Sequence, residues 1–116
     1  MYDERNVIKI LTLDTVAGDD VVVNGTLTAT GVSADVNIDP WDVTVNQTVT
    51  ATGNIEIYAD NDATFGANGD LMANTGPGYI EVIADNDVSG LGGGALFMDD
   101  DTVFNAGSGM VNLSAA

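Results

Sequence analysis

Three short acidic clusters contain the residues of this chain whose types and spacing could do chemistry. Two of them read ADND, at residues 59–62 and 84–87, and the third reads DDD at residues 99–101. Carboxylates about 4.8 Å apart on neighbouring strands repel by roughly 1 kcal/mol in water and by several times that at an effective dielectric near 20, so a stacked column of them favours a bound cation. Calcium suits such oxygen-only corners. The candidate calcium ligands are Asp60, Asp62, Asp85, Asp87, Asp99 and Asp101.

The same aspartates also have a purely structural interpretation, because Asp forms tight turns and its carboxylate can project into solvent. The sequence contains neither an EF-hand loop nor the glycine-aspartate nonapeptide of calcium-dependent toxin repeats. Calcium-binding corners and solvated turn residues therefore both remain open. No cofactor is required by either interpretation, and calcium is the one that the acidic corners favour.

Catalysis is not expected from this composition. The chain has no His and no Cys, and its two basic residues, Arg5 and Lys9, precede the regular repeats, so the usual general bases, thiolates and anion clamps are missing. A pair of acids can hydrolyse a glycoside, but acids at every corner look periodic rather than convergent. We expect no enzyme, and a carbohydrate-active β-helix fragment is a distant alternative.

The charge of the chain excludes two classes of partner. Its formal net charge is -16, from 18 acidic residues against two basic ones, so it cannot displace the counterions of nucleic acid and is repelled by anionic lipid. Its apolar stretches are far shorter than a membrane span. Because 45% of the residues are hydrophobic, the chain is expected to fold, as a single domain over residues 1–116.

An internal repeat indicates how the acidic clusters are positioned. DVVVNGTLTATG at residues 20–31 returns as DVTVNQTVTATG at residues 42–53, a shift of 22. The same shift places Asn68 and Leu71 in a third copy. IEIYADNDAT at residues 55–64 returns as IEVIADNDVS at residues 80–89, a shift of 25 that stacks the two ADND clusters and brings Leu71 onto Leu96. Such fixed self-similarity is typical of solenoids.

Apolar and polar residues alternate within each copy, which predicts strands, and the copies are separated by Gly, Asn and Asp corners. An antiparallel sandwich also has short alternating strands, but it does not require one strand type to return at constant spacing. We therefore predict an all-β fold, a parallel β-solenoid (β-helix) of about four to five coils of roughly 22–25 residues, with three short strands per coil.

The outward-facing positions predict ladders between coils. Asn24, Asn46 and Asn68 are expected to form a corner ladder through their amides. Outward threonines at residues 26, 28 and 30 lie over those at 48, 50 and 52. This resembles an ice-binding face, but the ladder stops at the next coil, and β-branched residues suit any strand.

Regularity decreases at both ends. Residues 1–19 are expected to form an irregular or capping first coil, residues 20–98 the regular repeats, and residues 99–116 an irregular last coil, open or truncated, with an extra strand inserted around Thr102 to Ala106. Val111 begins a strand of the Ile55 type, 31 residues after Ile80.

The segments GNIEIYADNDATFGANGDLMA and GYIEVIADNDVSGLGGGALFMDDDTVFNAGSGMVNLSAA resemble the repeats of large secreted bacterial surface proteins of the filamentous-haemagglutinin type. The resemblance implies a right-handed parallel β-helix and an extracellular or cell-surface location, with an export signal outside this sequence. It also implies a structural module of an adhesin-type fibre. Its partners would be the neighbouring repeats of a longer chain.

An alternative function follows from the apolar alternation in MVNLSAA and NVIKILTL. Each of these segments could pair with a further coil, because an uncovered coil exposes unpaired backbone groups over an apolar core. The chain would then be a protomer that associates with itself head to tail and forms an extracellular filament.

Overall fold

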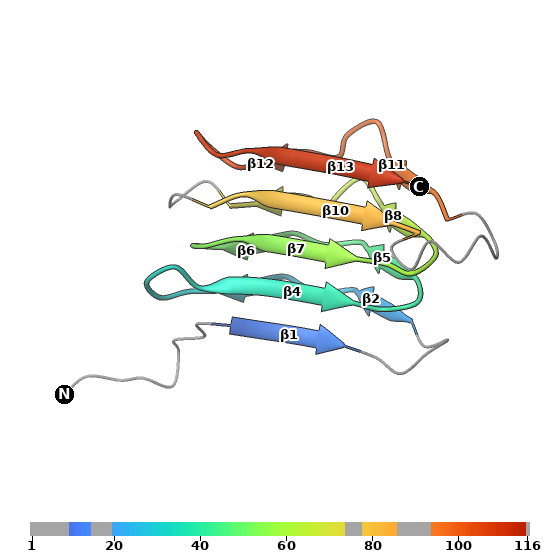
Figure 1. Cartoon of the computed structure of the whole chain (residues 1–116). Helices are drawn as coiled ribbons and strands as arrows, with labels where there is room; N and C mark the ends of the chain where they lie inside the picture. Colours follow the sequence, from blue (N-terminus) through green and yellow to red (C-terminus); the bar gives the residue numbers. More distant parts are fainter. Residues whose placement is uncertain (1–9, 15–19, 74–77, 86–93, 116) are drawn as a thin grey trace.

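The computed structural model describes residues 10–14, 20–73, 78–85 and 94–115, and within these ranges the chain forms strands and turns with no helix. The strands lie in three parallel sheets that wind along one axis (Figure 1). Sheet A contains β1 (Ile10–Asp14), β4 (Asp35–Asp39), β7 (Ile55–Tyr58), β10 (Ile80–Ala84) and β13 (Val111–Ala115). Sheet B contains β2 (Val21–Val23), β5 (Val43–Val45), β8 (Ala63–Phe65) and β11 (Leu96–Met98). Sheet C contains β3 (Leu27–Ala29), β6 (Val49–Ala51), β9 (Leu71–Met72) and β12 (Phe104–Asn105).

The described strands make four coils of three strands, each coil contributing one strand to each sheet. We call them coil 1 (β2, β3, β4), coil 2 (β5, β6, β7), coil 3 (β8, β9, β10) and coil 4 (β11, β12, β13), with β1 stacked on coil 1 (Figure 1). The predicted parallel β-solenoid is confirmed. No helix in the described part of the chain is long and apolar enough to cross a membrane.

Alternation along each strand builds the core, because every second side chain points into the coil. Val36, Ile55 and Ile80 are register partners on β4, β7 and β10, and each is fully buried. A second column contains Ile38, Ile57 and Val82. Each apolar side chain thus packs on its counterpart in the next coil, as the repeat predicts.

The number of residues in a coil varies, although the strands of each sheet remain aligned with their neighbours. At the start of the sheet B strands, successive coils are offset by 22, 20 and 33 residues. Leu71 pairs with Val49 below it and with Phe104 above it, whereas Leu96 pairs with Ala63. The expected pairing of Leu71 with Leu96 is therefore wrong, because Leu71 lies in sheet C and Leu96 in sheet B.

The Asn ladder is shorter than expected for the same reason. Asn46 Nδ2 donates to Asn24 Oδ1 at 2.9 Å, which confirms the first rung. The next coil places Gly66 beside Asn46, since Gly66 N donates to the carbonyl of Val45. Asn68 instead lies exposed in the longer connection between β8 and β9. The three-membered ladder is thus wrong in its third member.

The C-terminal coil is regular in its strands. The segment from Thr102 to Ala106 contains β12, which pairs with β9 in sheet C, so it is not an extra strand. Val111 pairs with Ile80, as expected from the sequence. At the other end, β1 pairs with β4 over all five of its residues.

A column of glycines allows the coils to approach at the corner before sheet A. A Cβ on Gly78 would lie 1.9 Å from the carbonyl oxygen of Gly53, and one on Gly109 would lie 1.9 Å from that of Gly78. Both distances are far below van der Waals contact. The glycines that precede β7, β10 and β13 are therefore required by the stacking distance.

Candidate functional site

The corners before β2, β5 and β8 in sheet B each carry an aspartate that binds the coil above it. Asp20 Oδ1 accepts the backbone N–H of Asp42 at 3.3 Å, and Asp42 Oδ1 accepts that of Asp62 at 2.9 Å. Asp62 Oδ1 accepts the N–H of Ala95 at 2.9 Å. Hydrogen bonds between a carboxylate and backbone N–H groups are charge-assisted and stronger than neutral ones. These aspartates therefore connect successive coils.

The other two sheets use the same arrangement. Before sheet A, Asp35 Oδ1 accepts the N–H of Asn54 at 2.7 Å, and Asn54 Oδ1 accepts that of Tyr79 at 3.0 Å. Before sheet C, Asp70 Oδ1 accepts the N–H of Val103 at 2.9 Å. In each of the three sheets, therefore, at least one strand is preceded by an Asp or Asn whose side chain binds the next coil.

The candidate calcium ligands do not gather in one place. Asp60 and Asp62 flank Asn61 in the corner before β8, and Asp99 and Asp101 share one exposed turn, in which Asp101 N donates to Asp99 Oδ1 at 3.3 Å. Asp87 lies outside the described residues. Among the described residues, no three acidic side chains are placed so that together they could hold a metal ion.

The two ADND clusters are stacked out of step, contrary to the expected offset of 25. Asp85 N donates to the carbonyl of Asn61 at 2.9 Å, so Asp85 lies on Asn61 rather than on Asp60. Asp62 lies beside Ala95. The strands keep the offset of 25 from Ile55 to Tyr58, and the regular pairing ends in the corner that follows them.

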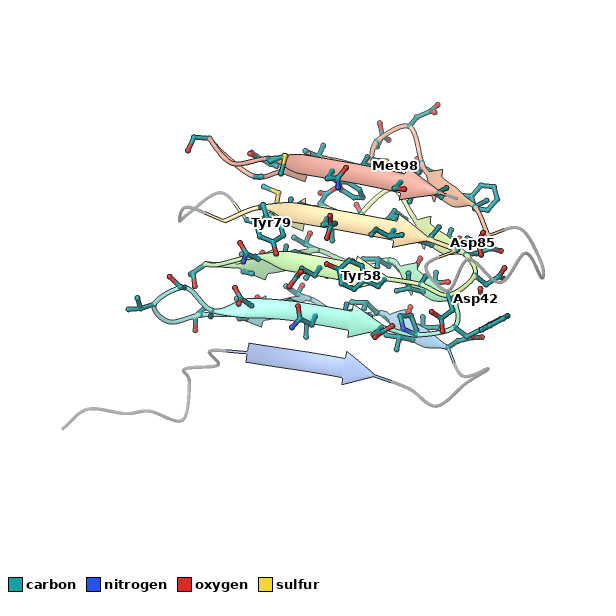
Figure 2. All side chains as sticks on the ribbon, viewed as in Figure 1. Asp42, Tyr58, Tyr79, Asp85 and Met98 are labelled. Carbon is teal, nitrogen blue, oxygen red and sulfur yellow. The ribbon has the colours of Figure 1, made fainter. Side chains whose placement is uncertain are left out.

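A cluster of two tyrosines and two glutamates on the outer face of sheet A was not foreseen from the sequence. Glu56 and Glu81 are register partners on β7 and β10. Tyr58 Oη lies 2.6 Å from Glu56 Oε2 and 2.5 Å from Glu81 Oε1. Tyr79 Oη donates to the same Glu56 oxygen at 3.0 Å. Figure 2 shows Tyr58 on β7 and Tyr79 at the start of β10, on the same face.

The tyrosine hydroxyls stabilise two like charges that lie side by side. Burial, followed by the hydrogen bonds to both glutamates, raises the pKa of Tyr58 well above its ordinary value of 10.0. The hydrogen bond to Glu56, followed by burial, raises the pKa of Tyr79. Both phenols therefore stay neutral donors at physiological pH. Two carboxylates one strand apart repel by roughly 3 kcal/mol at an effective dielectric near 20, which these donors offset.

A sequence signal for this cluster exists. In GNIEIY and GYIEVI, Glu occupies the same outward position of consecutive coils, and Tyr lies two residues after it in one coil and two before it in the other. Residues two apart on a strand share a face. The diagonal contact between coils follows once the strands are stacked at an offset of 25.

The ladder of outward threonines spans only coils 1 and 2. Thr28 pairs with Thr50, but Thr50 pairs next with Met72. Thr52 Oγ1 donates to the carbonyl of Gly31 at 2.6 Å and accepts the N–H of Ala34 at 2.9 Å, so it fastens a corner.

The last strand presents an uncovered apolar edge. Val111 and Leu113 continue the inward columns of Ile80 and Val82, yet each is 40% exposed. Met110 beside them is more exposed still. On β4, β7 and β10 the side chains at these inward positions are buried. On β13 the side chains at the same positions are exposed.

Comparison with known proteins adds no relative. No protein-family model, no curated protein and no solved structure matches this chain. Function is therefore argued from the arrangement of its own residues.

Proposed function

We propose that this chain is a structural β-solenoid segment of a secreted bacterial cell-surface or adhesin-type fibre protein. The observation that carries the proposal is the continuity of the core columns. Ile55 and Ile80 are fully buried, and Val111, next in the column, keeps the same inward position at 40% exposure. A further coil stacked on β13 would cover it, which is the relation of one repeat to the next in a longer rod.

The contacts between coils suit a rod that bears load along its axis. Backbone hydrogen bonds join each pair of neighbouring coils in all three sheets. Side chains add the Asn24–Asn46 bond, the aspartate bonds before the strands, and the bridge from Tyr58 to two glutamates. The net charge of -16 keeps such rods apart laterally. Stiffness along the axis and repulsion across it are the properties of a stalk.

The test is the location of the chain on the cells that make it. Antibodies raised against the purified chain should label fibres on intact cells in immunogold electron microscopy, and mild protease treatment of intact cells should remove the label. Labelling that requires permeabilised cells would contradict the proposal.

Head-to-tail self-association is the second candidate, and the exposed inward side chains of β13 favour it. β1 and β13 are the two outer strands of sheet A, so pairing β13 of one copy with β1 of the next would extend that sheet. Such an interface is heterologous and need not close, so it yields filaments rather than rings. High salt should promote it by screening the net charge of -16.

Two substitutions on β13 distinguish this candidate from the stalk segment. Leu113→Asp places a charge in the inward column, whereas Ser114→Asp places the same charge at the outward position beside Ile83. Analytical ultracentrifugation and electron microscopy across a salt and calcium series should show straight filaments for the unmodified chain and for Ser114→Asp, and monomers for Leu113→Asp. Monomers of the unmodified chain under every condition would eliminate self-assembly and leave the stalk proposal standing.

A further inference from the structure

Asparagine is followed by glycine at two places in the sequence, residues 24–25 and 68–69. An Asn-Gly pair is chemically reactive, because glycine has no side chain to shield its backbone nitrogen from the amide carbon of the asparagine. The structure exposes both Asn24 and Gly25, in the corner between β2 and β3. Between β8 and β9 it exposes Asn68 but buries Gly69. The fold therefore places the same dipeptide in two different environments.

The backbone nitrogen of Gly69 is held in place. Its N–H donates to the carbonyl of Gly66 at 2.8 Å, and a Cβ on Gly69 would lie 2.1 Å from the carbonyl oxygen of Val45 in the coil below. To attack the Asn68 side chain, this nitrogen would have to leave its hydrogen bond and turn within a closely packed corner. Gly25 has nothing within 4 Å of its Cβ, and its N–H donates to no group in the described part of the chain. The nitrogen of Gly25 is thus free to move.

The next coil contacts the Asn24 side chain at its oxygen. Asn46 Nδ2 donates to Asn24 Oδ1 at 2.9 Å. When a nucleophile attacks an amide carbon, negative charge develops on this oxygen, and a hydrogen-bond donor already aimed at it stabilises that charge. The same contact leaves the nitrogen of the Asn24 amide, the leaving group, outside the hydrogen bond. The bond between Asn24 and Asn46 therefore favours attack on Asn24 as well as joining two coils.

We propose that Asn24 is a site of spontaneous deamidation, promoted by Asn46 of the next coil, and that the fold protects Asn68 from the same reaction. The backbone nitrogen of Gly25 forms a bond to Asn24 Cγ, and the bond from Cγ to Nδ2 breaks. The proton lost by the Gly25 nitrogen leaves with the departing ammonia. Water then opens the resulting cyclic imide at either carbonyl, which yields aspartate or isoaspartate at position 24. Water is the only co-reactant.

The two products have different effects on coil 1. An aspartate at position 24 keeps an acceptor for the Asn46 amide, in the arrangement that Asp42 Oδ1 already makes with Asn61 Nδ2 at 2.9 Å. Isoaspartate instead adds one methylene to the main chain between β2 and β3. The added length disturbs the pairing of Leu27 with Val49 in sheet C. Deamidation thus converts coil 1 into a more negative form or into a less stable one.

The test is to incubate the full chain in mildly alkaline buffer, with and without urea, and to digest samples with a protease that cleaves before aspartate. The peptides 20–34 and 62–69 then carry the two asparagines separately. Aspartate at position 24 or 68 creates a new cleavage site, whereas isoaspartate leaves the peptide whole with the mass of the deamidated form. In the folded chain Asn24 should convert at least about tenfold faster than Asn68, because Gly69 must first open locally. In urea the two rates should be similar.

Two variants separate the parts of the proposal. Gly25→Ala fits the open corner and should stop the conversion of Asn24 in the folded chain while leaving Asn68 unchanged. Asn46→Ala removes the donor and should slow the conversion of Asn24 about fivefold. A hydrogen bond that merely kept the corner rigid would have the opposite effect, so unchanged or faster conversion in Asn46→Ala would overturn the role of Asn46. Absence of conversion at Asn24 in the folded chain, or conversion of Asn68 at the same rate, would overturn the site.

Discussion

Coils 2 and 4 contain the same alternation of residues but differ in what covers them. Ile57 of coil 2 is fully buried between Ile38 and Val82. Leu113 of coil 4 occupies the same column and is 40% exposed, because it has a neighbour on one side only. Burial in a solenoid is therefore a property of the stack rather than of the residue, and each coil supplies half of the core of the next.

The largest expected effect comes from shortening side chains in this column. Ile57→Ala should lower the free energy of unfolding by about 2–5 kcal/mol, since it leaves a cavity between two coils. Leu113→Ala should cost about 1 kcal/mol, because much of that side chain already contacts water. Urea denaturation followed by Trp41 fluorescence measures both. Equal losses in dilute solution would contradict the difference between the coils.

The glycine column allows a second comparison between an enclosed position and an outer one. Gly78→Ala should destabilise the chain by about 3 kcal/mol, because its Cβ meets the Gly53 carbonyl while Gly109 packs on it from the other side. Gly109→Ala meets the Gly78 carbonyl and the Ala106 carbonyl oxygen of its own coil, but coil 4 can shift outward, so about 1 kcal/mol is expected. Thermal unfolding by circular dichroism should rank the two variants in this order. Gly25→Ala, with nothing within 4 Å of its Cβ, is the control for the loss of glycine itself.

The tyrosine bridge between coils 2 and 3 is expected to have a smaller effect. Tyr58→Phe removes the hydroxyl that lies within hydrogen-bond distance of both Glu56 and Glu81, and should cost about 1–3 kcal/mol. Adding Glu81→Gln to this variant should restore most of the loss, because the repulsion is removed with the donor. A double variant no more stable than Tyr58→Phe would show that the hydroxyl acts through packing and not through the two charges.

The same bridge predicts how stability depends on alkaline pH. The pKa values of Tyr58 and Tyr79 are raised above 10.0 in the folded chain, so unfolding releases phenolic protons in alkali. Their contribution to stability is complete below pH 10.0 and falls as the pH rises further. Tm measured between about pH 9 and about pH 11 should decline, and less steeply in Tyr58→Phe. Parallel declines in the two proteins would refute this assignment.

The smallest expected effect on stability compares an Asn that is hydrogen-bonded to the neighbouring coil with an exposed Asn in a connection between strands. Asn46→Ala removes the hydrogen bond between the side-chain amides of Asn46 and Asn24, and should cost about 1 kcal/mol. Asn68→Ala, in the exposed connection between β8 and β9, should change stability by less than about 0.5 kcal/mol. Urea midpoints of the two variants test the comparison, and a similar loss from both would favour the ladder of three that the sequence suggested.

The fold could be predicted from the sequence for two reasons. The alternation of apolar and polar residues follows the two-residue period of a strand, and the repeated segments follow the stacking of one coil on the next. Strand pairs such as Ile55 with Ile80 and Val21 with Val43 follow directly from the offsets of 25 and 22. Corner lengths could not be predicted in this way. An ungapped comparison puts Asn68 over Asn46, whereas the structure starts β8 two residues earlier and lengthens the corner after it.

The site residues were only partly predictable for a related reason. Asp85 was identified by its residue type, but its burial and its hydrogen bond to the Asn61 carbonyl depend on how the corner stacks on the coil below. The Tyr58 bridge depends on a diagonal contact between coils, which comparison of aligned positions does not reveal. The acidic turn at residues 99–101 follows from local turn chemistry and needs no neighbour.

The aspartate and asparagine bonds before the strands all have the same polarity. In each pair the acceptor belongs to the earlier coil and the donor to the later one, from Asp20 with Asp42 through Asp62 with Ala95, and likewise in the other two sheets from Asp35 with Asn54 to Asp70 with Val103. A coil that has formed therefore displays side-chain acceptors for the backbone N–H groups of the coil that follows it. We therefore expect the coils to wind most readily from the amino end, each turn forming on the one before it.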